Sequence, residues 1–420
     1  MRPPLLLLAA VSVAFSALAF GQSPPSADFL RGIERYNAGD RAGAIAAWTA
    51  HLAKNPKDVA AYANRAVARQ QTRDLEGAIA DLTRLIELQP KDPAHYCNRS
   101  QLRRENGDLE GAIADATRAL TLDPKRILAY EHRCLAELMK GDLDAAIADA
   151  NRRLALDPKS TGAYYHRGLA KRSGGDLDGG IADFNRAIAA DSQNADAWYQ
   201  RGLAWSARED FAKAISDYNT AISLAPQAAD VFLARARAER IRGHFDAALA
   251  DYDRALAIRP EFANAHFGRG TVHYLQQRWP EAYADFAAAG RPPQPQPYAW
   301  IYGCAVRVRI GQGDAGRREL REQRDRSHLD TKAGWLGQLA GYLLGEVNDE
   351  QLFAAAGDPE TSVVAREQYY EALYFAGLQQ VAAGHPIEAA KRFKQCLEKE
   401  LKFFTAYGFP ATELRTMGVP

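Results

Sequence analysis

Two histidines come closest to a metal-binding pattern in this chain. His266 and His273 are seven residues apart in a segment with helical periodicity, so they would lie about two turns apart on one helix. A zinc site needs further ligands at short spacing, and neither a HExxH motif nor a suitably placed carboxylate accompanies the pair. The sequence therefore predicts no metal site here.

A glycine-rich segment at residues 311–316, Gly-Gln-Gly-Asp-Ala-Gly, matches the dinucleotide-binding pattern GxGxxG. That pattern functions between a strand and a helix of a parallel sheet, and no alternation of strands and helices surrounds it. We interpret Gly313-Asp314 as a turn between two helices. No nucleophile elbow, phosphate loop or Cys–His catalytic pattern occurs elsewhere. The sequence predicts a protein that is not an enzyme and needs no cofactor.

Four cysteines, Cys97, Cys134, Cys304 and Cys396, lack the spacing of metal ligands. In an oxidising compartment Cys97 and Cys134 could form a disulfide, because they occupy neighbouring repeats. The alternative is that all four are small buried side chains, and we favour it.

An internal repeat determines which elements position these residues. Prolines recur every 34 residues at Pro56, Pro90, Pro124 and Pro158, and again at Pro226 and Pro260, with Ser192 in the intervening place. Eight repeats follow, at 25–58, 59–92, 93–126, 127–160, 161–194, 195–228, 229–262 and 263–296. Residues are numbered below by their position, 1 to 34, within a repeat. Such a period indicates stacked helical pairs.

Within each repeat, residue types recur as a helix–turn–helix unit requires. Position 4 is aromatic in most repeats, position 8 is small in all eight, and position 20 is Ala or Gly. Small residues allow the two helices to approach closely. A Gly-Asp turn, such as Gly141-Asp142, ends the first helix and caps the second. These features resemble the tetratricopeptide-repeat family over residues 25–296. The resemblance implies an all-α solenoid, a right-handed superhelix with a concave groove lined by the first helices.

Arginine occupies position 7 in all eight repeats, and aspartate occupies position 23 in seven. An arginine stripe alone would suggest an anion-binding surface. Because an acid recurs at the same period, we interpret the two rows as ion pairs between helices.

The groove is the predicted binding site for peptides. Position 6 carries groups that can hydrogen-bond a peptide backbone: Asn64, Asn98, His132, His166 and Gln200. Positions 5 and 12 add aromatic and arginine anchors: Tyr165, Tyr199, Phe267, Arg104, Arg172 and Arg240. The alternative is a solvated face without a ligand. The chaperone-tail clamp known in the family is not expected, because position 5 lacks its lysine in the early repeats.

After the proline-rich segment 291–297 the period is lost, and residues 297–420 form a predicted helical C-terminal region. One further repeat-like unit is predicted at 370–403, followed by an aromatic tail that caps the array. This region resembles the bacterial cell-envelope tetratricopeptide lipoproteins that act as adaptors for peptidoglycan hydrolases and a processing protease. The residues that carry this likeness are Trp335, Leu343-Leu344-Gly345, Leu352, Ala354–Ala356, Glu371-Ala372, Tyr374-Phe375, Gly377 and Phe404–Leu414.

The first 21 residues predict a secretory signal peptide: Arg2, an apolar stretch from Leu5 to Phe20, and Ala17-Leu18-Ala19 before a cleavage site. An uncleaved membrane anchor is the alternative. No cysteine is present for lipid attachment, so we expect a periplasmic or secreted protein.

Composition favours protein partners. Apart from Arg2 the chain carries 52 basic and 52 acidic residues, a balance that argues against nucleic acid as partner. The sequence predicts an adaptor that holds protein or peptide partners in the bacterial cell envelope. The alternative is a non-catalytic regulatory or substrate-recognition subunit of an envelope enzyme.

Overall fold

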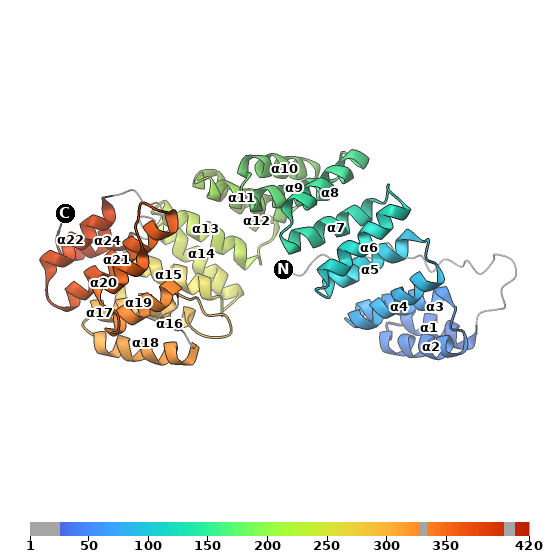
Figure 1. Cartoon of the computed structure of the whole chain (residues 1–420), viewed down its shortest axis with the longest axis horizontal. Coiled ribbons are helices and arrows are strands. Elements are labelled where there is room, and N and C mark those ends of the chain that lie inside the picture. Colours follow the sequence, from blue (N-terminus) through green and yellow to red (C-terminus); the bar gives the residue numbers. More distant parts are fainter. Residues whose placement is uncertain (1–25, 328–333, 399–407, 420) are drawn as a thin grey trace. The chain divides into compact units, whose positions relative to one another are not determined.

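A computed structural model describes residues 26–327, 334–398 and 408–419, and within these ranges it contains helices and no strands. The helices belong to two compact bodies: an N-terminal body ending at Arg208 and a C-terminal body starting at Glu209 (Figure 1). The predicted segment boundary at residue 297 does not separate them, since the division falls inside the sixth repeat. The proposed signal peptide lies outside the described residues.

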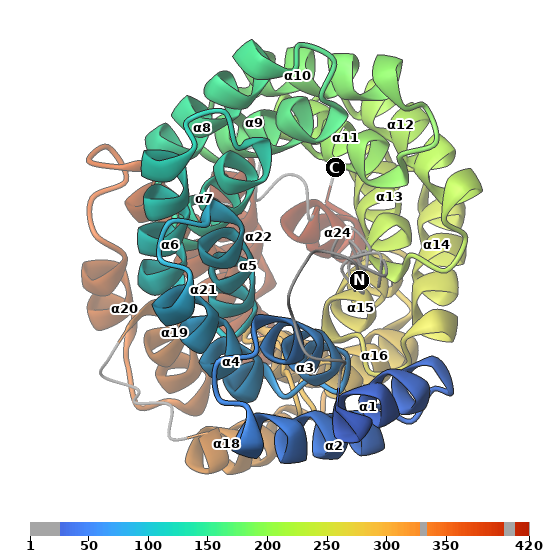
Figure 2. The same cartoon turned by 90° about the vertical axis from the view of Figure 1, so that its right-hand side faces the viewer.

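The N-terminal body consists of five helical pairs and the first helix of a sixth: α1 (Ala27–Asn37), α2 (Arg41–Lys54), α3 (Val59–Gln71), α4 (Leu75–Leu88), α5 (Pro93–Glu105), α6 (Leu109–Leu122), α7 (Ile127–Lys140), α8 (Leu143–Leu156), α9 (Thr161–Ser173), α10 (Leu177–Ala190) and α11 (Ala195–Ala207). Figure 2 shows α5, α9 and α11 on the inner side of this curved body and α6, α8 and α10 on its outer side. From α5 onward the first helices of successive pairs also contact one another: α5 contacts α7, α7 contacts α9 and α9 contacts α11.

The described helices of the C-terminal body are α12 (Phe211–Leu224), α13 (Ala229–Ile241), α14 (Phe245–Ile258), α15 (Ala263–Leu275), α16 (Trp279–Ala289), α17 (Ala299–Arg309), α18 (Gly313–Ser327), α19 (Gly334–Leu344), α20 (Asp349–Ala356), α21 (Val363–Ala382), α22 (Pro386–Leu397) and α24 (Phe409–Thr416). The glycine-rich segment 311–316 lies between two helices, as predicted, but the turn falls at Gly311, with φ of 75°, and Gly313-Asp314 already belong to the first turn of α18. None of the described helices is both long and apolar enough to cross a membrane.

Local chemistry explains the turn inside each repeat. At Gly141 the backbone has φ of 87°, a left-handed conformation that glycine adopts without strain. The carboxylate of Asp142 then accepts a hydrogen bond from the backbone N–H of Ala145 and caps α8. Equivalent caps recur at Asp40, Asp74, Asp108, Asp176 and Asp210.

The recurring aromatic side chain at position 4 holds the turn between repeats. The hydroxyl of Tyr164 donates to the carbonyl of Pro158 at 3.1 Å. Trp198 uses its indole N–H in the same way, on the carbonyl of Ser192 at 3.0 Å. His266, at this position in the eighth repeat, places Nε2 2.9 Å from the carbonyl of Pro260. Tyrosine, tryptophan and histidine at position 4 thus all bond the carbonyl of the residue six positions earlier.

Small residues at position 8 permit close packing within a pair. A Cβ atom added to Gly168 would lie 2.8 Å from the ring of Phe184, closer than packed atoms allow. Gly377 has the same relation to Phe393, at 2.5 Å. The pair α21–α22 therefore packs like a repeat, although α21 is longer.

All four cysteines are free and buried. The thiol of Cys134 donates to the carbonyl of Ala146 at 3.3 Å, and that of Cys396 to Tyr370 at 3.6 Å. The interpretation as small buried side chains agrees with this arrangement, and no disulfide joins Cys97 to Cys134.

The core of the C-terminal body continues from α15 to α24 without a break at the proline-rich segment. At its centre the hydroxyls of Tyr274 and Tyr374 lie 2.8 Å apart, and Tyr274 also donates to Glu413 of the last helix. Arg309 pairs with Glu413 at 3.0 Å. Phe409 packs against Tyr274 with ring centroids 4.2 Å apart. The tail residues Phe403, Phe404 and Tyr407 lie outside the described part of the chain.

Candidate functional site

The recurring arginines and aspartates are paired with each other. In the fifth repeat, Arg167 binds Asp183 through two nitrogens, at 2.8 and 2.6 Å. Asp183 is fully buried and also lies 2.8 Å from Lys171. The same pairing occurs at Arg65–Asp81, Arg99–Asp115, Arg133–Asp149, Arg235–Asp251 and Arg269–Asp285. The ion-pair interpretation of the two rows is therefore confirmed for these repeats.

Each of these arginines also reaches back to the preceding repeat. The third nitrogen of Arg167 donates to Asn151, 16 residues earlier, at 2.6 Å. Arg65 and Arg99 use threonine hydroxyls in the same place, Thr49 and Thr83. With both ends of the guanidinium occupied, these arginines are structural and leave the binding role to other residues.

The two histidines considered for metal binding also have structural partners. His266 and His273 both face Asp285, at 3.2 and 3.6 Å, beside Arg269. Among the described residues no group of three or more His, Cys, Asp or Glu side chains is placed to hold a metal ion.

The predicted groove residues divide between the two bodies. Nine of them, on α3, α5, α7, α9 and α11, are half-buried in the N-terminal body: Asn64, Asn98, Arg104, His132, Tyr165, His166, Arg172, Tyr199 and Gln200. Phe267 and Arg240 belong to the C-terminal body and are only 8% and 7% exposed. The ring of Phe267 packs between Phe286 and Tyr302. The prediction that these two side chains line an open groove is therefore wrong, because both are buried by packing.

The two position-6 histidines are neutral at physiological pH. His132 donates through Nδ1 to the carbonyl of Cys97, at 3.0 Å, and so links α7 to α5. Burial, reinforced by the charges of Arg104, Arg153 and Arg126, lowers the pKa of His132 to about 4. Burial and the arginines Arg153 and Arg104 also lower the pKa of His166 to about 4. Three arginines thus converge on these rings.

These three residues, Arg104, Arg126 and Arg153, are called the arginine cluster here. Arg153 pairs with Glu131 at 3.1 Å, and both side chains are about one-eighth exposed. Among the described residues Arg104 has no ion pair; its Nη1 lies 4.0 Å from the sulfur of Met139. The cluster therefore carries more positive charge than its half-buried carboxylate balances.

Sequence reasoning found only Arg104 among the three. Arg126 and Arg153 could have been found in the sequence, because each departs from the residue types that recur at its position in the repeat. Position 27 is Ala, Leu or His in the other seven repeats, where Arg153 stands here. Position 34 carries a capping Asp or Asn before α3, α5 and α11, whereas Arg126 starts α7 without a side-chain cap.

A second group of side chains lies next to the arginine cluster on α9 and α11. Burial raises the pKa of Tyr165 to about 12, with a further contribution from Asp196. Its ring contacts His166 and Phe184, at centroid distances of 5.7 and 6.1 Å. The Nε of Arg172 and the Oε1 of Gln200 are buried without hydrogen bonds. An aromatic ring and polar atoms without hydrogen bonds therefore occur together on α9 and α11.

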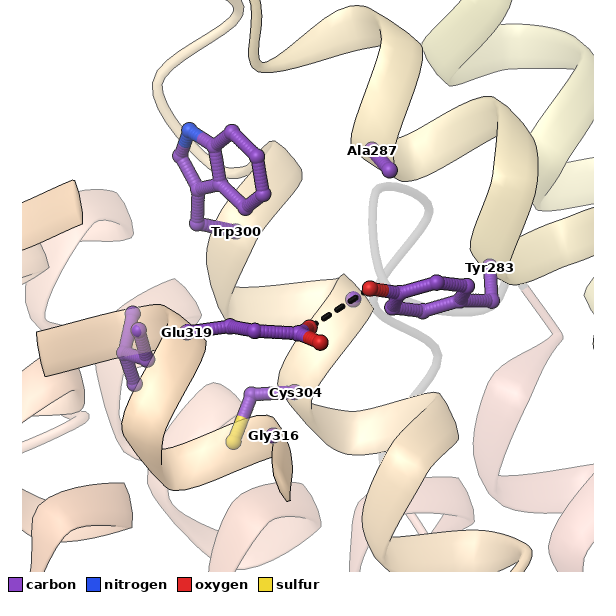
Figure 3. A pocket seen from close by; sticks show the side chains of 8 residues that line it. Tyr283, Ala287, Trp300, Cys304, Gly316 and Glu319 are labelled. Atoms are coloured by element: carbon purple, nitrogen blue, oxygen red, sulfur yellow. Dashed lines mark hydrogen bonds between the residues drawn. The ribbon is translucent and has the colours of Figure 1, made fainter. Parts of the chain in front are cut away.

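A crevice in the C-terminal body is not a comparable site. It lies among Tyr283, Trp300 and Glu319 on α16, α17 and α18 (Figure 3). Tyr283 donates to Glu319 at 2.6 Å, and Arg307 covers the Tyr283 ring at 4.0 Å. The crevice has no room for a water molecule.

Comparison with protein families finds repeat models along the chain. Models described as "Tetratricopeptide repeat" match residues 29–93, 97–161, 161–194 and 195–227, and one described as "TPR repeat" matches 236–277. Together they cover more than half of the chain. None of the curated proteins matches it.

Solved structures also resemble the chain. A tetratricopeptide repeat protein from Parabacteroides merdae shares 19% identity and a TM-score of 0.50, over 58% of this chain and 96% of its own. MamA shares 27% identity, with a TM-score of 0.37, over 39% and 96%. YrrB, described as a TPR protein with an unusual peptide-binding site, shares 22% identity, with a TM-score of 0.37, over 44% and 95%. The first likeness supports a helical repeat fold.

Proposed function

The chain belongs to the tetratricopeptide-repeat family, and from that premise we propose that it is a protein-interaction adaptor that binds extended peptide segments along its N-terminal body. Proteins built from these repeats serve generally as interaction scaffolds. The observation that carries the groove proposal is the row of polar groups on α3, α5, α7, α9 and α11, one in each repeat. A peptide in extended conformation needs donors and acceptors at such a regular rise.

The cell envelope is the proposed location. It rests on the apolar segment after Arg2 and on the likeness of residues 331–414 to envelope adaptor lipoproteins. Within the envelope we propose the periplasm, because the apolar segment has the features of a cleavable signal peptide. The alternative, a non-catalytic subunit of one envelope enzyme, shares this location and differs in the number of partners.

A display library of short random peptides tests the binding role directly. We expect the immobilised chain to enrich peptides, and a photo-reactive residue in place of Asn98 to cross-link to them. Failure to enrich any peptide over an unrelated helical protein would remove the groove proposal. Capture from the cell-envelope fraction then separates the alternatives, because one stoichiometric enzyme would indicate a subunit and several unrelated partners an adaptor.

A further inference from the structure

Repeat 4 and the residue before it depart from the rest of the array in a concerted way. Position 5 is apolar or aromatic in every other repeat but is Glu131 here, and position 27 holds Arg153 where five of the other repeats have alanine. Those alanines are fully buried. Arg126, at the start of α7, places a cation at a helix N-terminus, where the helix dipole disfavours it. Arg153 pairs with Glu131 of α7, and Arg153 and Arg126 both act on the neighbouring His132.

The arginine cluster has unused hydrogen-bonding capacity. Five nitrogen atoms here are buried and have no hydrogen-bond partner. They are the Nε of Arg104, Arg126 and Arg153, the Nη1 of Arg153 and the Nδ1 of His166. Buried donors without partners are costly, since each loses its bonds to water. A guanidinium group is suited to the two oxygens of a carboxylate. An anion would supply what the fold leaves unsatisfied.

The fold itself does not require this charge. Burial lowers the pKa of Arg104, although Glu105 and Glu131 oppose the effect. Alanine fills the place of Arg153 in repeats 3, 5, 6, 7 and 8. A cation kept where an apolar residue would pack points to recognition rather than to stability.

We propose that the arginine cluster binds a carboxylate of an acidic peptide segment, and that Tyr165 and Tyr199 hold an aromatic or apolar residue next to it. The proposal rests on the peptide-binding function proposed above and names the chemistry of the partner. The two places adjoin on α9, because Tyr165 is next to His166 in sequence and the charges of Arg153 and Arg104 act on His166. The preferred segment is acidic, with an apolar residue close by.

The test uses the peptides that the full chain enriches from the random display library. We expect Asp or Glu in the enriched pool. Replacing the acids of the tightest peptide by their amides should weaken binding, and more so at low salt. Preparing that peptide with a free and with an amidated C-terminus identifies whether a side-chain or a terminal carboxylate is bound. An enriched pool without acids, or with phosphate-dependent binding only, overturns the proposal while leaving the peptide-binding function intact. An empty pool contradicts both.

Variants separate the cluster from general charge. Arg104→Met should weaken binding of the acidic peptide by about tenfold to a hundredfold, the loss expected for a hydrogen bond to a charged group. It should leave Tm unchanged or raised, whereas a structural role would lower it. Arg152→Met, which removes an exposed arginine from the same body, is the matched control and should bind normally.

A second variant keeps the net charge constant. Arg153→Ala combined with Glu131→Ala removes one cation and its own partner, and restores the residue that other repeats carry at position 27. Loss of acidic-peptide binding in this folded variant supports the cluster. Binding equal to wild type in both this variant and Arg104→Met overturns it.

Discussion

The guanidinium of Arg167 joins three helices through Asp183, 16 residues ahead, and Asn151, 16 residues behind. Asp183 is fully buried and pairs with Arg167, Lys171 and the more exposed Arg186, so removing its carboxylate leaves three cations without this anion. We expect Asp183→Ala to destabilise the N-terminal body by about 3–5 kcal/mol, measured by urea unfolding. The control, Asp178→Ala, removes an exposed carboxylate and should cost less than about 1 kcal/mol. Equal effects would contradict the role of the buried pair.

Asp183 also predicts how stability depends on acid. Despite burial, hydrogen bonds from Arg167 and Lys171 hold the pKa of this carboxyl below its usual 3.8. Its contribution is therefore present at neutral pH and is lost as the pH falls through the folded-state pKa. Asp183→Ala should lose less stability than wild type on acidification below about pH 4. Urea midpoints of variant and wild type that fall by the same amount on acidification would contradict this prediction.

A glutamate in the C-terminal body predicts the opposite sign. Burial raises the pKa of Glu371 to about 7, although Trp335 donates to it at 2.5 Å. The folded state holds this proton more tightly, so stability falls as the pH rises from the usual 4.5 to about 7. Glu371→Gln should raise stability by about 1–3 kcal/mol at pH 8 and by much less near pH 5. Tm values of the variant and of wild type, measured from pH 5 to pH 8, test this prediction. A difference in Tm that does not change with pH would contradict it.

The groove tyrosines predict a change in binding. Tyr165→Ala with Tyr199→Ala should weaken an enriched peptide by about tenfold to several hundredfold, because each buried anchor contributes roughly 1–2 kcal/mol. Since Tyr165 packs against Phe184, Tm should fall as well, and titrations belong well below both Tm values. Leu156→Ala, at an exposed leucine, is the control. Normal binding by the folded double variant would show that the tyrosines are not anchors.

The N-terminal segment predicts processing. In a bacterial host with a secretion pathway, we expect the mature chain to start between about residues 20 and 23. N-terminal sequencing of the periplasmic fraction measures it. An intact Met1 in the cytosolic fraction would contradict the proposed location.

Periodicity made much of this molecule predictable. The pairing of Arg167 with Asp183 follows from the sequence because both rows share a 34-residue period and a constant separation of 16. The arginine cluster did not follow, since departures from a period mark unusual residues without saying where they meet. Phe267 was assigned to the groove by its position, but Tyr302 of α17 covers it. The 34-residue period could not predict this contact, because Tyr302 lies outside the repeats.

The contacts of Glu413 have a consequence for how the protein forms during synthesis. The arginine and aspartate rows join residues 16 apart, so helical pairs of the N-terminal body can fold as they leave the ribosome. Tyr274 instead bonds a partner that is synthesised 139 residues later. Until then its hydroxyl and the apolar surface around it lack their final neighbours. The C-terminal body is thus the slow, high-contact-order part, and a truncated nascent chain exposes a surface that chaperones recognise.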